Sequence, residues 1–87
     1  MNCFEYDPKK STSNFKKHGI DFVTAQKLWD DPDLIEISVI ANDEARFLIV
    51  ACITGKHWSA IITHRSGIIR IISVRRSRKS EIELYES

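Results

Sequence analysis

The fold is decided by residues 46–75, which read RFLIVACITGKHWSAIITHRSGIIRIISVR. The stretch is rich in Ile and Val and is interrupted by turn residues at Thr54-Gly55-Lys56 and at Ser66-Gly67, a pattern typical of strands joined by tight turns. We predict strands over residues 46–54, 57–65 and 68–75. Because the connections are so short, these strands should pair antiparallel. A further strand is expected over residues 34–40, followed by a turn at Asn42-Asp43.

Upstream of this stretch, the residues carry the signals of one short strand and one helix. Cys3 to Tyr6 alternates apolar and polar residues and predicts a first strand that ends at Asp7-Pro8. Proline suits the first turn of a helix, and Gly19 suits the left-handed position that ends one. We therefore expect a helix over residues 8–18.

Two more helices complete the expected fold. Asp21 is a favourable N-cap, and apolar residues recur at helical spacing from Phe22 to Trp29 before Asp30-Asp31-Pro32-Asp33 ends the pattern. Near the C-terminus, Ser77 or Ser80 can cap a short helix over residues 81–86. The predicted order is β-α-α-β-β-β-β-α, an α+β fold with a mainly antiparallel sheet packed by two N-terminal helices and a short C-terminal helix.

Alternation along the last strand predicts which side chains share a face of the sheet. One face should carry Ile69, Ile71, Ser73 and Arg75, and the other Arg70, Ile72 and Val74. Both sets are mainly apolar, so we expect helices to cover one side and arginines to emerge where that cover ends.

Length and composition indicate a single domain over residues 1–87. The chain has 87 residues, of which 43% are hydrophobic, near the lower size at which one core is stable alone. No apolar run approaches the ~20 residues that cross a bilayer, and Met1 to Lys10 lacks the features of a secretory signal. We expect a cytoplasmic protein without a membrane anchor. Cys3 and Cys52 lack metal-ligand spacing, which predicts reduced thiols and no disulfide.

Charge is segregated along the chain although the net charge is only +1. Residues 46–80 hold eight cations and no carboxylate, whereas residues 21–45 hold seven carboxylates against Lys27. Cations on strands bind phosphate oxygens, and arginine does so with a bidentate fork, so the basic segment predicts a surface for RNA phosphates. The alternative is a solvated surface that pairs with the acidic segment. The lack of interspersed carboxylates favours phosphate binding, because structural charged surfaces usually alternate in sign.

Few side chains suit acid-base or metal chemistry. Lys17-His18-Gly19 has two interpretations: cations at a helix C-terminus stabilise the helix dipole, and imidazole acts as a general acid or base near neutral pH. His57 and His64 lie by predicted turns and suit surface roles better. A helix stop explains Asp30, Asp31 and Asp33 more simply than a magnesium site does, so we assign no metal.

The aromatic residues divide into two groups. Trp29 and Trp58 fall within apolar patterns and are expected in the core rather than stacked on bases. Tyr85, on the terminal helix, can pack its ring and still point its hydroxyl at the rim of arginines, although packing alone is the commoner outcome.

Several short pieces of the sequence stand in a specific order and spacing. The first half contributes Phe4-Glu5-Tyr6-Asp7, Lys9, Asn14, Lys17-His18-Gly19-Ile20, Phe22, Ala25 and Asp31-Pro32. The second half contributes Glu44-Ala45-Arg46-Phe47, Thr63, Arg65, Arg70-Ile71-Ile72-Ser73-Val74-Arg75, Glu81 and Tyr85. Together they resemble the BrnT toxins of bacterial type II toxin-antitoxin systems over nearly the whole chain, with departures at Tyr6, Ile62 and Val74.

The resemblance implies a RelE-like ribonuclease fold and metal-independent cleavage of RNA that inhibits translation. It also implies neutralisation by a cognate BrnA-like antitoxin with a ribbon-helix-helix DNA-binding domain, so operator DNA would be bound only through the complex. No cofactor is implied.

Metal-free cleavage needs a base for the 2′-hydroxyl, positive charge for the phosphorane and a proton for the 5′-oxygen. We expect Arg65 and Arg75 to stabilise the phosphorane. A proton would be moved by Lys17 or His18, and Tyr85 would orient the phosphate or donate a hydrogen bond to it. The residues expected to guide RNA electrostatically are Lys16, Arg46, Arg76, Arg78 and Lys79.

A different class of function uses the same charges. The chain would then be a non-catalytic interaction module whose basic face binds an acidic, DNA-binding partner and acts only in transcriptional autoregulation. Both interpretations are open at the level of sequence.

Overall fold

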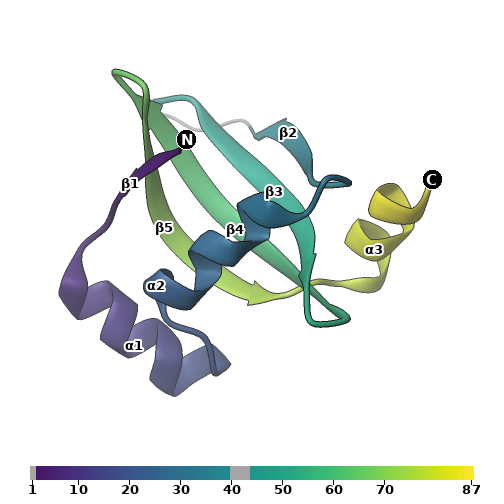
Figure 1. Cartoon of the computed structure of the whole chain (residues 1–87), viewed down its shortest axis with the longest axis horizontal. Helices are drawn as coiled ribbons and strands as arrows, with labels where there is room; N and C mark the ends of the chain where they lie inside the picture. Colours follow the sequence, from purple (N-terminus) through teal and green to yellow (C-terminus); the bar gives the residue numbers. More distant parts are fainter. Residues whose placement is uncertain (1, 40–43) are drawn as a thin grey trace.

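A computed structural model describes residues 2–39 and 44–87 of the chain. It contains a five-stranded sheet in the order β1-β5-β4-β3-β2, with helices packed against it (Figure 1). Strand β1 (Cys3–Glu5) runs parallel to β5, and all other neighbouring strands are antiparallel. The α+β class and the mainly antiparallel sheet are thus confirmed.

The four longer strands agree with the sequence-based prediction to within one residue at every end that lies among the described residues; the predicted end of the 34–40 strand, residue 40, lies outside them. They are β2 (Ile35–Val39), β3 (Arg46–Ile53), β4 (Lys56–Arg65) and β5 (Ile68–Arg76). Both predicted hairpin turns form, with φ of 49° and 80° at Thr54 and Gly55 and of 51° and 82° at Ser66 and Gly67. Two consecutive left-handed residues match the right-handed twist of the joined strands. The turn predicted at Asn42-Asp43 lies outside the described residues.

Helix α1 (Pro8–His18) begins and ends where the sequence predicts. The Asp7 carboxylate accepts a hydrogen bond from the Lys9 amide at 2.9 Å, and Gly19 ends the helix with φ of 79°. Lys16, Lys17 and His18 occupy the last turn, where positive charge interacts favourably with the helix dipole.

Helix α1 is attached to the sheet through polar side chains. Ser11 and Asn14 are buried, whereas Phe15 is 57% exposed. The Asn14 amide nitrogen donates to the carbonyls of Ile20 and Val74, at 2.8 and 2.9 Å, and its oxygen accepts from the Val74 amide at 3.1 Å. Strand β1 pairs with β5 only as far as Arg70. Beyond the end of β1, the Asn14 side chain takes its place as the hydrogen-bond partner of the β5 backbone.

The second predicted helix is shorter in its α-helical part than the pattern suggests. Helix α2 (Phe22–Ala25) continues as the 3₁₀ helix η1 (Gln26–Asp30). Asp21 caps α2 as predicted, since its carboxylate accepts from the Thr24 amide at 2.7 Å. The 3₁₀ segment still buries Leu28 completely.

A β-bulge in β5 overturns the predicted alternation. Ile61 of β4 is opposite Ser73, but the next residue, Ile62, is opposite Ile71, so Ile72 has no partner in β4. The extra residue reverses the facing of all later positions. Val74 therefore joins Ile69 and Ile71 in the core, and Ser73 and Arg75 lie on the other face. The predicted alternation, which grouped Ser73 and Arg75 with Ile69 and Ile71 and put Val74 on the other face, was therefore wrong for Ser73, Val74 and Arg75.

The core lies between one face of the sheet and the helices α1, α2 and η1. It is formed by Ile20, Phe22, Ala25, Leu28, Ile49, Ala51, Ala60, Ile62, Ile69, Ile71 and Val74. Trp29 and Trp58 are partly buried against this cluster, which confirms the prediction for both. We call this side of the sheet the core face, and the side that carries Val50, Ser59 and Arg75 the opposite face.

Helix α3 (Lys79–Glu86) covers one end of the opposite face, where Ser59 and Val50 are buried. Its N-cap is Arg78 rather than the predicted Ser77 or Ser80. The Ser77 hydroxyl is 2.7 Å from that of Ser59 instead, and the Glu81 carboxylate accepts from the Arg78 amide at 2.8 Å. Arginine is disfavoured at an N-cap. It is accepted here because the Glu81 carboxylate supplies the hydrogen-bond acceptor for the amide of the capping residue.

Candidate functional site

Arg65 and Arg75 lie at opposite ends of the sheet. Arg75 of β5 is opposite Ser59 of β4, and Arg65 follows Ser59 by six residues along the same strand. Six residues of strand extend about 20 Å. The guanidinium of Arg75 stays beside Ser59, because both contact Glu81. The two arginines therefore do not converge on one phosphate, which corrects the expectation that they share it.

Arg75 is bound by the first turn of α3. Its Nη1 and Nη2 atoms donate to Oε1 and Oε2 of Glu81, each at 2.8 Å, and Nη1 also donates to the Arg76 carbonyl at 3.3 Å. Glu81 additionally accepts from the Ser59 hydroxyl at 2.9 Å. The two side chains are 28% and 10% exposed, so part of the Arg75 side chain still reaches the surface.

The Arg75–Glu81 pair is electrostatically well matched. The hydrogen bonds from Arg75, helped by those from the Arg78 amide and the Ser59 hydroxyl, outweigh burial and lower the pKa of Glu81 to about 2. The same hydrogen bonds raise the pKa of Arg75. Both groups are therefore charged throughout the physiological range, and the pair fixes α3 on β5.

Tyr85 meets a carboxylate rather than the rim of arginines. Its hydroxyl donates to Oδ2 of Asp31 at 2.6 Å, and the same oxygen accepts from the Cys52 amide at 2.8 Å. The hydrogen bond to Asp31 and burial raise the pKa of Tyr85, so the phenol stays protonated and acts as a donor. Burial opposes ionisation of Asp31, but its hydrogen bonds prevail and lower the pKa of that carboxyl. The Tyr85 ring also stands edge-on to His57.

The other end of the opposite face is not covered by α3 and carries a row of polar residues. Thr63 and Arg70 are opposite each other on β4 and β5, and Arg70 is opposite Glu5 of β1. Phe47 of β3 is opposite Ile62 of β4 in an antiparallel register, so Arg46, which precedes Phe47, lies beside Thr63, which follows Ile62. We call Glu5, Arg70, Thr63 and Arg46 the Thr63 row. Sequence reasoning gave no role to Thr63 or Arg70, because only the sheet register brings them together.

Lys16, Lys17 and His18 are all exposed on the last turn of α1. Within residues 2–39 and 44–87, no hydrogen bond or ion pair joins them to Arg65, Arg75 or Tyr85. His18 follows Asn14 by one helical turn, about 6 Å, and Asn14 is bonded to Val74, the neighbour of Arg75. The end of α1 and Arg75 thus lie at the same end of β5, although α1 packs on the core face and Arg75 lies on the opposite face. Figure 1 shows α1 beside β5.

The other cations predicted to bind RNA are also divided between the two ends of the sheet. Arg76, Arg78 and Lys79 are exposed at the junction of β5 and α3, near Arg75. The guanidinium of Arg76 lies 5.4 Å from the centre of the Trp58 ring and donates to the His57 carbonyl at 3.2 Å. Arg46 is exposed in the Thr63 row, at the end of the sheet that also holds Arg65.

The two other histidines pair with carboxylates. Nε2 of His57 is 3.2 Å from Glu86, and Nε2 of His64 is 3.2 Å from Glu36. His57 belongs to the anchoring of α3, and His64 also stands edge-on to Phe47. Surface roles for both agree with the sequence-based interpretation.

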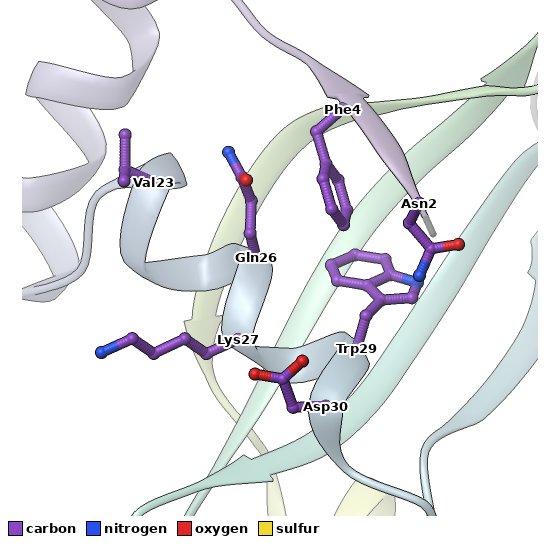
Figure 2. Close-up of a pocket in the computed structure, with 7 residues that line it drawn as sticks. All are labelled: Asn2, Phe4, Val23, Gln26, Lys27, Trp29 and Asp30. Carbon is purple, nitrogen blue, oxygen red and sulfur yellow. The ribbon is translucent and has the colours of Figure 1, made fainter.

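Two hollows formed by the described residues are lined by side chains other than Arg65 and Arg75. One, of about 460 Å³, is formed between β1 and η1, where Phe4 stands against Trp29 with their ring centres 5.0 Å apart (Figure 2). Another, of about 250 Å³, is lined by Phe15, Lys16 and Asp21.

The described ranges show neither a cluster of metal ligands nor a membrane-spanning helix. In residues 2–39 and 44–87, no three side chains of His, Cys, Asp or Glu gather as metal ligands. Cys3 and Cys52 are both free thiols. No helix in that part of the chain is long and apolar enough to span a bilayer.

A known protein family matches the chain over most of its length. Residues 6–81 match the family model described as "Ribonuclease toxin, BrnT, of type II toxin-antitoxin system". The match spans α1, the whole antiparallel part of the sheet and the first turn of α3, including Glu81. No curated protein matches the chain.

Proposed function

Because the chain belongs to the BrnT family of ribonuclease toxins of type II toxin-antitoxin systems, we propose that it is an endoribonuclease that cleaves RNA without a metal ion and thereby inhibits translation in the cytoplasm. The whole chain, residues 1–87, acts as one BrnT-like toxin domain of RelE-like fold. The observation that carries the proposal is the family match, which covers the strands that hold the carboxylate-free run of cations.

The reaction centre is proposed around Arg75 at the end of β5, with α1 packed on the core face of that end and α3 on the opposite face. Four of the five residues that we expected to be catalytic belong to this end: Lys17, His18, Arg75 and Tyr85. Arg65 lies about 20 Å away along β4. It therefore has a different role and contacts a phosphate farther along the RNA.

Arg75 is proposed to stabilise the negative charge of the phosphorane. Its Nη1 and Nη2 atoms are engaged with Glu81, but a guanidinium has five N–H donors in a rigid plane, and the Nε edge remains for a phosphate oxygen. Glu81 fixes the orientation of the group before the substrate arrives. One preorganised donor of this kind typically contributes ~3 kcal/mol to catalysis, and such cations supply the charge that a metal ion provides in other nucleases.

Proton transfer is assigned to the end of α1. His18, or Lys17 beside it, removes the proton of the 2′-hydroxyl or protonates the 5′-oxygen, and both side chains are exposed. Tyr85 is a positioning residue, because its hydroxyl proton is engaged by Asp31 and a phenol has only one to donate. RNA is guided by exposed cations along the two ends of the sheet: Lys16, Arg46, Arg76, Arg78 and Lys79.

The partner is proposed to be a BrnA-like antitoxin with a ribbon-helix-helix domain, so operator DNA is bound only by the complex. Support comes from an apolar strip on the opposite face between α3 and the Thr63 row. Ile37, Leu48 and Ile61 are register neighbours there and are only half-buried. A partner that covers this strip and the flanking arginines blocks the approach of RNA.

Expression in growing cells tests the proposal. The wild-type chain should arrest growth and fragment cellular RNA, and co-expression of a short ribbon-helix-helix protein encoded beside it should relieve both effects. Arrest without RNA fragmentation, and a purified protein that never cleaves RNA even with ribosomes, would favour the non-catalytic module.

A further inference from the structure

The strongest unexplained feature of the structure is the hydroxyl of Thr63. Thr63 is only 1% exposed, and its Oγ1 atom is buried without a hydrogen-bond partner among the described residues. It is the one buried side-chain nitrogen or oxygen in those residues that lacks a partner. A buried polar group without a partner destabilises a fold, so the presence of this hydroxyl points to a ligand that it binds.

The surroundings of Thr63 define the chemistry of that ligand. Arg70 and Arg46 flank it on the neighbouring strands, and Arg65 is two residues away on the same face of β4. The three guanidinium groups around this hydroxyl only donate hydrogen bonds, and they outnumber the two carboxylates beside them, Glu5 and Glu44. The complementary ligand is an oxyanion, and arginine forks match phosphate in particular.

The carboxylates nearby hold these arginines only loosely. Arg70 is 3.6 Å from Glu5 and Arg65 is 3.5 Å from Glu44, with every one of these side chains more than 30% exposed. Exposed pairs of this kind contribute little to stability. They contrast with the Arg75–Glu81 pair, in which both distances are 2.8 Å. An incoming phosphate can therefore replace Glu5 and Glu44 without breaking a strong interaction.

We propose that the Thr63 row, together with Arg65, binds a backbone phosphate of the substrate RNA, about 13 Å along the sheet from Arg75, because Thr63 follows Ser59 by four residues. Arg70 turns from Glu5 to the phosphate, which opens access to Thr63, and the Thr63 hydroxyl then donates to a phosphate oxygen. Arg46 and Arg65 complete the set of donors. The site rests on the proposed ribonuclease function and adds a second contact that holds the RNA in register with Arg75.

Thr63→Val is the decisive variant, because it keeps the shape of the side chain and removes the hydroxyl. Binding is measured by fluorescence anisotropy with a short labelled 2′-O-methyl oligoribonucleotide, which lacks the attacking hydroxyl and is not cleaved. We expect Thr63→Val to unfold at the same or a higher temperature than wild type yet to bind this probe about tenfold more weakly. Thr63→Ser, which retains the hydroxyl, should bind within about twofold of wild type.

The arginines are tested by a matched set of charge changes. Arg70→Gln should weaken binding about tenfold and reduce the slope of log Kd against log salt by about 0.7, the value for one phosphate contact of a single strand. Glu5→Gln should tighten binding, because it releases Arg70. Lys10→Gln removes one charge from the exposed side of α1 and should change the affinity less than about twofold.

The outcomes separate this site from the function on which it rests. If wild type neither binds the probe nor cleaves unmodified RNA, the ribonuclease proposal and the site both fail. If wild type binds and cleaves but Thr63→Val and Arg70→Gln bind as tightly as wild type, only the site is wrong. Normal RNA binding by these variants together with weaker binding of the antitoxin would assign the row to the protein partner instead.

Discussion

Arg75 binds Glu81 through two parallel hydrogen bonds of 2.8 Å, and this pair joins the last strand of the sheet to the last helix. A cation proposed to act on RNA is thus also a structural link. Loss of activity after its removal therefore has two possible causes, and a matched pair of variants is needed to separate them.

Arg75→Ala and Glu81→Ala break the same ion pair, but only the first removes the proposed catalytic cation. Arg75→Ala should lower the rate of RNA cleavage by about 100-fold, the value of one lost transition-state donor. Glu81→Ala should stay within about tenfold of wild type, because the guanidinium remains. Circular dichroism at the assay temperature verifies that both are folded. Equal losses of activity in the two variants would mean that Arg75 acts only by holding α3.

The pH dependence of stability follows from the low pKa of Glu81. A carboxyl whose pKa is lower in the folded state, here about 2 against an ordinary 4.5, stabilises the fold above the ordinary value, and that stabilisation is lost as the pH falls towards the folded value. Glu81→Gln should therefore unfold more readily at neutral pH, by about 2 kcal/mol, and lose less stability than wild type between pH 4.5 and 2. Urea unfolding at several pH values measures this. Parallel curves for the two proteins would contradict it.

The hydrogen bond between Tyr85 and Asp31 should be worth more to folding than to catalysis. Tyr85→Phe removes the 2.6 Å contact to the carboxylate and should cost about 1–2 kcal/mol of unfolding free energy, with cleavage lowered less than about tenfold. In a double-mutant cycle with Asp31→Asn, the stability effects should be non-additive by about 1 kcal/mol. If Tyr85→Phe is as stable as wild type but inactive, the hydroxyl acts on the substrate.

The end of α1 is tested by separating its two candidate proton carriers. Replacing the proton carrier should lower the cleavage rate by about 10²- to 10⁴-fold, so His18→Ala or Lys17→Ala, but not both, should show that loss. Either change costs less than about 1 kcal/mol of stability through the helix dipole, which thermal unfolding verifies. Lys10→Ala, in the same helix, serves as the control. If both variants cleave at the wild-type rate, proton transfer occurs elsewhere.

Much of the fold was predictable because its signals are local. Gly19, Asp21 and Pro8 place helix ends through backbone chemistry that involves only their neighbours, and the turns at Gly55 and Gly67 place the strands. The bulge at Ile72 was not predictable, since it depends on the register with β4 rather than on alternation within β5. The burial of Asn14 rather than Phe15 likewise depends on the unpaired edge of β5.

The candidate site was predictable in its residue types but not in its arrangement. The run of cations from Arg46 to Lys79 is visible in the sequence, and Glu81 is among the pieces that resemble BrnT toxins. How these residues pair depends on the tertiary structure. Arg75 meets Glu81 because the bulge turns Arg75 to the face that α3 covers. Arg65 lies at the other end of the sheet because of the length of β4. The same register gathers Thr63 and Arg70, which no local pattern connects.

Cleavage of RNA by the purified chain tests the central claim most directly. The protein is incubated with RNA in the presence of EDTA, with and without translating ribosomes, and with and without a saturating amount of the co-purified antitoxin. We predict endonucleolytic products despite EDTA in at least one of the two antitoxin-free reactions, and the loss of both cleavage and RNA affinity when the antitoxin is added. Intact RNA in every reaction with wild-type protein, or cleavage that Arg75→Ala retains in full, would contradict the account.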